Sequence, residues 1–209
     1  MELSLFDDDL SEEEPPSDNQ PLAARLRPTT LEEYVGQSHV VAGEGLLANV
    51  FRSGELNSSF LFWGPPGSGK TTLAHLVARA SKQRVHYLSA VTAGLKELRE
   101  VVELARKTPG RHLLFLDEIH RFNKTQQDGL LPVLENGNLR LLGATTENPY
   151  FELRKALLSR CRVVQLEKLR AQDIANILKR ALAHPKGFEN LRVQMSEEVI
   201  QSLAQTADG

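Results

Sequence analysis

The stretch from Gly64 to Thr71 constrains the fold most, because it fits the pattern G-x-x-x-x-G-K-[ST]. A short apolar run at 59–63 precedes it, and apolar residues at helical spacing follow at 72–80. Between a strand and a helix, the glycines let backbone N–H groups turn toward phosphates, and the helix adds its positive N-terminal end. A turn that binds nothing is the alternative, which the flanking strand and helix disfavour. The segment predicts a site for ATP with Mg²⁺, formed by Gly64, Pro65, Pro66, Gly67, Ser68, Gly69, Lys70, Thr71 and Thr72. Lys70 can reach the β- and γ-phosphates, and the Thr71 hydroxyl can ligate Mg²⁺.

A pair of carboxylates, Asp117 and Glu118, follows the apolar run 113–116. Such a run predicts a buried strand, and ligands of open parallel sheets lie beyond the carboxyl ends of the strands. Asp117 would hold Mg²⁺ through water, and Glu118 would orient or deprotonate the attacking water. Alone, the pair could be a solvated strand end; after a phosphate loop it indicates the acidic strand of an ATPase.

Two later segments carry weaker signals. The polar run 145–149 follows an expected strand at 139–144, where it could contact the γ-phosphate or form a turn. Arg160 stands just before an expected strand at 162–166. Such an arginine is usually a solvated charge, but ATP hydrolysis shared between subunits requires one in trans.

Composition narrows the class of protein. The chain has 209 residues, 41% apolar and 25% charged, typical of a globular domain with a small appendage. A single cysteine, Cys161, allows no internal disulfide and no cysteine-based zinc site. The N-terminus resembles neither a signal nor a transit peptide, and no apolar run has membrane-spanning length. We therefore expect a cytoplasmic protein that does not associate with a membrane.

The first twenty residues differ from the rest. They hold eight of the 27 acidic residues and none of the 25 Lys and Arg residues, so we expect a disordered acidic tail over 1–20. Within it, Leu3, Leu5 and Phe6 have no core to join and are candidates for docking on a partner, the alternative being an unused tail. The remaining chain is mildly basic, which permits nucleic-acid binding without requiring it.

The order of elements predicts an α/β fold, with a five-stranded parallel sheet flanked by helices. We expect the core over 21–168, including a strand at 84–88 and helices at 95–107, 123–135 and 153–159. Two helices without further strands, the second capped by Ser196, would begin a small helical lid at 169–209. The abrupt end at Gly209 suggests a fragment.

These motifs resemble the AAA+ ATPases. Within that class, the chain resembles the bacterial replication-associated recombination protein A family, also called MgsA, whose eukaryotic relative is the Werner helicase-interacting protein. The resemblance rests on the segments 21–28, 64–74, 117–124, 126–128 and 143–149, which span nearly the whole chain after residue 20.

The resemblance implies roles for further residues. The strap at 25–37, with Arg27, Val35 and Gly36, would border the adenine. Thr146 matches the sensor 1 position, and Arg160, in a Ser-Arg-Cys triplet, would be the arginine finger of a neighbouring subunit. The sensor 2 arginine and the oligomerisation domain would follow Gly209. The peptide from Glu2 to Phe6 resembles the ligand of the bacterial sliding clamp, with Glu where Gln is usual.

The function so implied is a DNA-dependent ATPase of replication-fork maintenance, recombination and repair, acting at junctions of single- and double-stranded DNA. DNA, single-strand binding protein and the sliding clamp would be partners, and a homotetramer the assembly, in the nucleoid-associated cytoplasm. One alternative is a clamp-loader-like or branch-migration motor; the lack of a zinc-type cysteine cluster before Asp117 argues against a clamp-loader motor subunit. Another is an ATP-binding scaffold recruited to the clamp, against which an intact set of Lys70, Glu118 and Arg160 argues.

Overall fold

The computed structural model describes residues 21–188 and 193–207. The predicted clamp-binding residues Leu3, Leu5 and Phe6 lie outside the described residues. A five-stranded parallel sheet has the order β2-β3-β4-β1-β5. Its strands are β1 (Ser59–Trp63), β2 (Arg84–Ser89), β3 (His112–Asp117), β4 (Leu139–Thr145) and β5 (Cys161–Gln165). The apolar runs predicted at β1, β3 and β4 form its interior, because central strands with helices on both faces bury nearly all their side chains.

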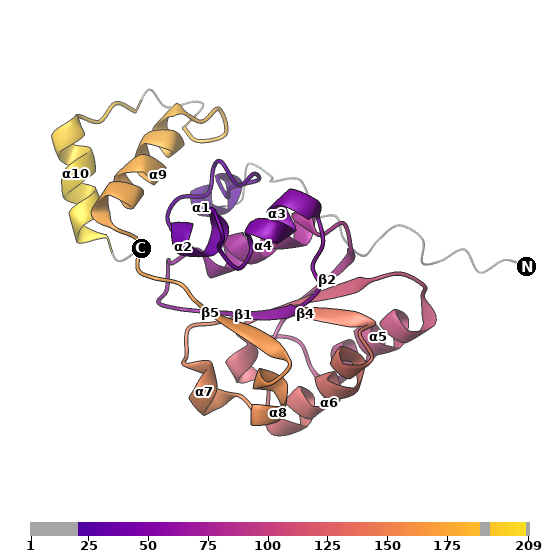
Figure 1. Ribbon diagram of the computed structural model, residues 1–209. Helices are drawn as coiled ribbons and strands as arrows, with labels where there is room; N and C mark the ends of the chain where they lie inside the picture. Colours follow the sequence, from indigo (N-terminus) through magenta and orange to yellow (C-terminus); the bar gives the residue numbers. More distant parts are fainter. Residues whose placement is uncertain (1–20, 189–192, 208–209) are drawn as a thin grey trace, which may run out of the picture.

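Helices cover both faces of the sheet (Figure 1). One face carries α1 (Leu22–Arg25), α2 (Ser38–Val41), α3 (Ala48–Ser53) and α4 (Lys70–Ala80). The other carries α5 (Leu95–Lys107), the 3₁₀ helix η1 (Ile119–Arg121), α6 (Lys124–Glu135), α7 (Pro149–Glu152) and α8 (Lys155–Leu158). Alternation along β1 divides the core: Phe60 and Phe62 pack with Leu73 of α4, whereas Leu61 packs with Leu98 of α5 and Leu130 of α6.

Beyond β5, α9 (Ala171–Ala183) and α10 (Glu197–Thr206) pack on each other, away from the sheet (Figure 1). Their small apolar contact includes Ile174 and Ile200, both buried. Ser196 caps α10 as the sequence predicts, since its side chain accepts a hydrogen bond from Val199 N–H. The pair contacts the N-terminal strap through Arg180, whose guanidinium donates to the carbonyls of Leu26 and Glu33.

Several sequence-based boundaries, among them those of β2, β4 and α6, differ from the structure by one residue. The fifth strand begins at Cys161, one residue early, and ends at Gln165. The helix predicted at 153–159 is confirmed in part, because α8 covers Lys155–Leu158, whereas the helix α7 was not predicted; Leu153 and Arg154 separate the two. The break is stabilised from outside the segment, because the Arg154 N–H donates to Gln127 Oε1 on α6 at 2.9 Å. No helix within the described residues is both long and apolar enough to cross a membrane.

Candidate nucleotide site

The phosphate loop connects β1 to α4, and Lys70, the first residue of α4, is buried. Its ammonium donates to the carbonyls of Gly64 at 2.9 Å and Pro65 at 2.8 Å, so it folds over its own loop. Burial lowers the pKa of Lys70, and the nearby carboxylates of Glu118 and Asp117 oppose this shift. A bound triphosphate would replace the two carbonyls as the partner of this cation.

Close contacts explain the glycines at both ends of the loop. A Cβ at Gly64 would lie 2.4 Å from the carbonyl oxygen of Leu166. Gly69 has φ +88°, and a Cβ there would lie 3.0 Å from the Tyr34 hydroxyl, which itself donates to the Gly69 carbonyl at 3.4 Å. Between them, the Ser68 hydroxyl is buried without a hydrogen-bond partner among the described residues. The two glycines thus permit close approaches of the backbone that a side chain would prevent.

Asp117 ends β3 and faces the start of α4. The strands are parallel and only β4 lies between β1 and β3, so the loop after β1 and the carboxylates at the end of β3 emerge close together at the carboxyl end of the sheet. There the Thr71 hydroxyl donates to Asp117 Oδ2 at 3.3 Å. The contact brings together two oxygen ligands of the kind that Mg²⁺ prefers, so the donor set fits the cation. No group of three or more His, Cys, Asp or Glu side chains in the described part of the chain could hold a metal ion. Phosphate oxygens and water would have to complete the Mg²⁺ shell.

Glu118 follows in a left-handed conformation, with φ +53°. Such a conformation is uncommon for a residue with a side chain and clusters at functional sites. It is held locally, because the Glu118 N–H donates to Asp117 Oδ1 at 3.0 Å.

The two threonines after β4 have different surroundings. Thr145 is buried, and its hydroxyl accepts from the Glu147 N–H at 3.0 Å. Thr146 is half-buried and follows the strand that lies between the loop and Asp117. Since Thr145 pairs with Trp63 in the register of β1 and β4, Thr146 lies beside the first residue of the loop.

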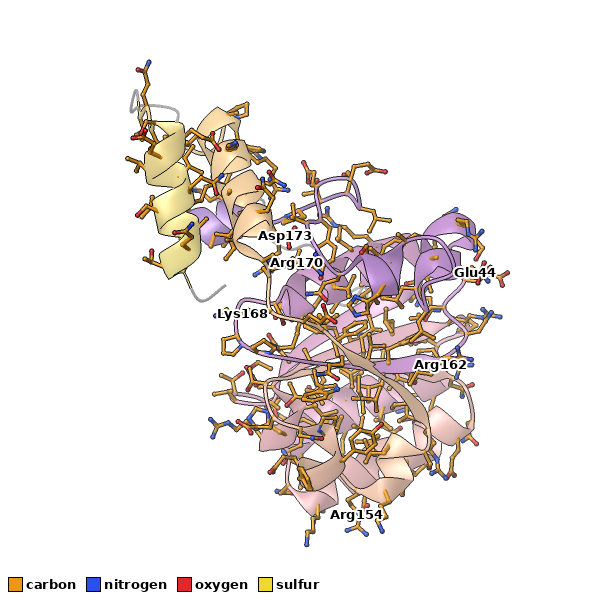
Figure 2. All side chains as sticks on the ribbon, turned by 60° about the vertical axis from the view of Figure 1, so that its left-hand side comes forward. Glu44, Arg154, Arg162, Lys168, Arg170 and Asp173 are labelled. Atoms are coloured by element: carbon orange, nitrogen blue, oxygen red, sulfur yellow. The ribbon has the colours of Figure 1, made fainter. Side chains whose placement is uncertain are left out.

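Arg160 lies at the opposite end of the strands, where the parallel strands begin. It precedes Cys161, which pairs with Ser59 at the start of β1, a strand length of about 16 Å from the loop. Figure 2 shows the two ends of the strands, with Arg162 near the start of β5 and Lys168 beyond its end. The Arg160 guanidinium pairs with Glu135 and donates to the Ala156 carbonyl. The structure therefore separates Arg160 from the site of its own chain.

The three residues of the strap that are predicted to border the adenine have different surroundings. The Arg27 guanidinium lies 3.0 Å from Nε2 of His75 on α4. Val35 is half-buried, and a Cβ at Gly36 would lie 2.7 Å from Leu169, at the start of the helical pair. The strap thus touches both α4 and the segment that leads to α9.

Sequence reasoning included Gln37 in the strap but assigned it no contact of its own; it is buried with φ +55°. Its Nε2 donates to the carbonyls of Ser68 at 3.2 Å and Glu167 at 2.7 Å, and its Oε1 accepts from the Glu167 N–H at 3.0 Å. Gln37 therefore joins the phosphate loop to the segment between β5 and α9. The only signal in the sequence is the neighbouring glycine, which does not identify the partners.

Together, the phosphate loop, the acidic end of β3 and the central β4 define a P-loop ATPase domain of the AAA+ class. The profile of the family described as "Holliday junction DNA helicase RuvB P-loop domain" matches residues 26–158. The chain belongs to this family, and its curated relatives place it with replication-associated recombination protein A and WRNIP1.

Three comparisons document the relationship. The chain is 46% identical over 199 residues to replication-associated recombination protein A of Escherichia coli (strain K12), covering 92% of the chain and 44% of the relative. It is 47% identical over 192 residues to ATPase WRNIP1 of Dictyostelium discoideum, covering 90% and 22%. The Thermotoga maritima RuvB Holliday junction branch migration motor superposes with a TM-score of 0.68 and 29% identity, over 86% of this chain and 59% of that one. The chain spans less than half the length of these two curated relatives.

Proposed function

We propose that this chain supplies the ATP-hydrolysing domain of a DNA-dependent ATPase that acts in replication-fork maintenance, recombination and repair. Its substrates would be junctions of single- and double-stranded DNA. The proposal that it hydrolyses ATP rests on one observation: four side chains come together at the carboxyl end of the sheet, those of Lys70, Thr71, Asp117 and Glu118. The names of the curated relatives support the part played in replication and recombination.

In the proposed reaction, the phosphate loop and Lys70 bind the β- and γ-phosphates. Mg²⁺, held by Thr71 and through water by Asp117, would neutralise phosphate charge. Glu118 orients a water molecule and takes its proton as the oxygen attacks the γ-phosphorus. The bond to the β–γ bridging oxygen breaks, and ADP and inorganic phosphate leave. Thr146 would contact the γ-phosphate from the end of β4.

Arg160 completes the site in trans. Because Arg160 precedes the start of β5, a strand length from the phosphate loop, it would not reach the nucleotide of its own chain but would be available to a neighbouring subunit. An arginine supplied in this way stabilises charge in the transition state of phosphoryl transfer. To act there, Arg160 would exchange its ion pair with Glu135 for the phosphate of the neighbour. The assembly would be a homotetramer in the full-length protein.

The partners follow from the same reading. DNA would bind the assembled subunits, with single-strand binding protein and the sliding clamp nearby, and the clamp would contact Leu3, Leu5 and Phe6. The location would be the nucleoid-associated cytoplasm. Arg27, Val35 and Gly36 would border the adenine, consistent with their strap lying between α4 and the helical pair.

The test is ATP turnover by the protein without DNA, with duplex, and with a fork that contains a single-stranded gap. We expect strong stimulation by the fork, and loss of turnover in both Glu118→Gln and Arg160→Ala. Glu100→Gln, an exposed substitution on α5, is the matched control. Turnover that survives Glu118→Gln would contradict the mechanism; ATP binding without turnover on any DNA would favour the scaffold.

A second candidate, a branch-migration motor, is favoured by the match to the RuvB domain. Migration of a Holliday junction by the protein, without any such action on forks, would favour this branch-migration motor.

A further inference from the structure

His120, in the middle of η1, lies between the carboxylate of Glu118 and the end of β4. Its Nδ1 is 2.9 Å from the hydroxyl oxygen of Thr145 and 3.3 Å from Glu118 Oε2. The imidazole is nearly enclosed, with 12% of its side chain exposed. The same nitrogen, Nδ1, thus faces both the hydroxyl of Thr145 at the end of β4 and the carboxylate of Glu118, the proposed general base.

Glu118 Oε2 is buried and makes no hydrogen bond within the described part of the chain. The contact with His120 Nδ1 is close enough to be electrostatic, but its direction falls short of a hydrogen bond. A buried carboxylate oxygen without a partner is costly, so its position needs an explanation. The Glu118 side chain keeps 35% of its surface exposed, and this exposure belongs to the other atoms.

The neighbours of His120 indicate which nitrogen carries its hydrogen. A bare Nδ1 would direct its lone pair at a carboxylate oxygen 3.3 Å away, which is unfavourable. A hydrogen on Nδ1 instead donates to the Thr145 hydroxyl and is attracted by Glu118. Thr145 can accept it, because its own hydrogen can point to the Glu147 carbonyl at 3.3 Å. The arrangement favours the Nδ1–H form of the ring.

We propose that His120 is a positioning residue for Glu118. Thr145 holds the Nδ1–H of His120 at the end of β4, and this N–H draws Glu118 Oε2 inward, so that Oε1 faces the attacking water. The left-handed backbone of Glu118 supplies the turn, but leaves the side chain to be oriented by its neighbours. The inference rests on the proposed role of Glu118 as the base, and adds to it how that base is held.

Two substitutions of similar size separate this role from simple packing. In His120→Asn the side-chain amide stands near the place of Nδ1, whereas in His120→Gln it stands near Nε2. We expect His120→Gln to lower kcat by about 10- to 100-fold, a part of what a general base contributes, with the KM for ATP little changed. His120→Asn should recover most of that loss. His39→Gln, an exposed histidine on α2 that bonds the Gln165 carbonyl, is the control.

Glu118→Gln distinguishes failure of the inference from failure of the proposed function. If Glu118→Gln leaves turnover intact, the proposed function fails and the inference with it. If Glu118→Gln stops turnover while His120→Gln matches or exceeds the wild-type rate, only the inference is overturned. Equal loss in His120→Asn and His120→Gln, or a parallel loss of ATP affinity, would show a packing role and also overturn it.

A readout without turnover uses the nitrogen NMR signals of His120 in the protein alone. We expect the neutral ring to carry its hydrogen on Nδ1, and the Nδ1 signal to move in Glu118→Gln and in Thr145→Val. A ring with its hydrogen on Nε2, unaffected by either substitution, would refute the proposal whatever the rate of ATP hydrolysis.

Discussion

The hydroxyl of Thr71 lies 3.3 Å from Oδ2 of Asp117, so a single hydrogen bond joins the start of α4 to the end of β3. The two residues are far apart in the chain; they meet because α4 follows β1, and the parallel strands β1 and β3, with only β4 between them, end at the same side of the sheet. This hydrogen bond keeps together the two oxygen-bearing side chains that would hold Mg²⁺, Thr71 directly and Asp117 through water. The pair is therefore preorganised for Mg²⁺.

Asp117→Asn should weaken nucleotide binding only when Mg²⁺ is present. The amide removes the negative charge that attracts the cation, and we expect the affinity for ATP with Mg²⁺ to fall by about 10- to 100-fold. Titration of a fluorescent ATP analogue with Mg²⁺ and with EDTA measures both affinities. Asp128→Asn, which breaks an exposed ion pair with Arg154, is the control. An equal loss in EDTA would mean that Asp117 supports the loop rather than the cation.

Mixing two inactive variants should restore ATP hydrolysis. A subunit with Arg160→Ala still contributes Glu118, and a neighbour with Glu118→Gln still contributes Arg160. In a mixed assembly some sites then hold both groups, so turnover should rise well above that of either variant alone. The measurement is DNA-stimulated phosphate release as the ratio of the two variants is varied.

The distance between Arg160 and its own phosphate loop makes this expectation specific. Were the arginine to act within its own chain, no mixture could contain an intact site. Activity that stays at the level of the separate variants, in mixtures shown to exchange subunits, would contradict the trans arrangement.

The sequence predicts those parts of the fold that depend on local pattern. The strand around Leu114 follows from a continuous apolar run and the helix from Leu95 to Lys107 from apolar periodicity, and the structure confirms both. The break at Arg154 was not predicted, because its cause is Gln127 on another helix. Long-range hydrogen bonds leave no periodic trace in a sequence.

The same distinction holds for the candidate site. The motif predicts that Lys70 and Asp117 converge, since a phosphate loop and an acidic strand end share one edge of such a sheet. It does not predict the contact of His120 with Glu118 and Thr145, which depends on the backbone turn at Glu118. The partner of Arg160 lies in a second chain by hypothesis, so neither the sequence nor one subunit can supply it.

Gln37→Ala should destabilise the fold and weaken nucleotide binding together. Its removal leaves the Glu167 N–H and the carbonyls of Ser68 and Glu167 without their partner. We expect a loss of about 2 kcal/mol in the free energy of unfolding, because buried groups lose hydrogen bonds. Urea denaturation measures it, with Gln172→Ala on the exposed side of α9 expected within about 0.5 kcal/mol of wild type. A change of the same small size in both variants would show that the bridge through Gln37 adds nothing.

The buried pair of His86 and His112 should make stability depend on pH. His112 Nε2 can donate to the Thr108 carbonyl at 3.4 Å, which leaves its Nδ1 to accept from His86 Nε2 at 2.9 Å. Both rings are then neutral. Burial, followed by the neighbouring His112 and Arg84, lowers the pKa of His86 to about 4.

The sign follows from the proton balance. An unfolded histidine has a pKa of about 6.5, so between this value and about 4 the unfolded chain binds the proton and the folded chain does not. The contribution of His86 to stability is therefore complete above pH 6.5 and is lost as the pH falls toward 4. Urea midpoints measured from pH 8 to pH 4.5 should decrease through this window. His86→Gln keeps a donor for His112 but does not titrate, so its midpoints should decrease less, whereas His39→Gln should follow the wild type. Parallel curves for wild type and His86→Gln would mean that His86 titrates alike in the folded and unfolded chains.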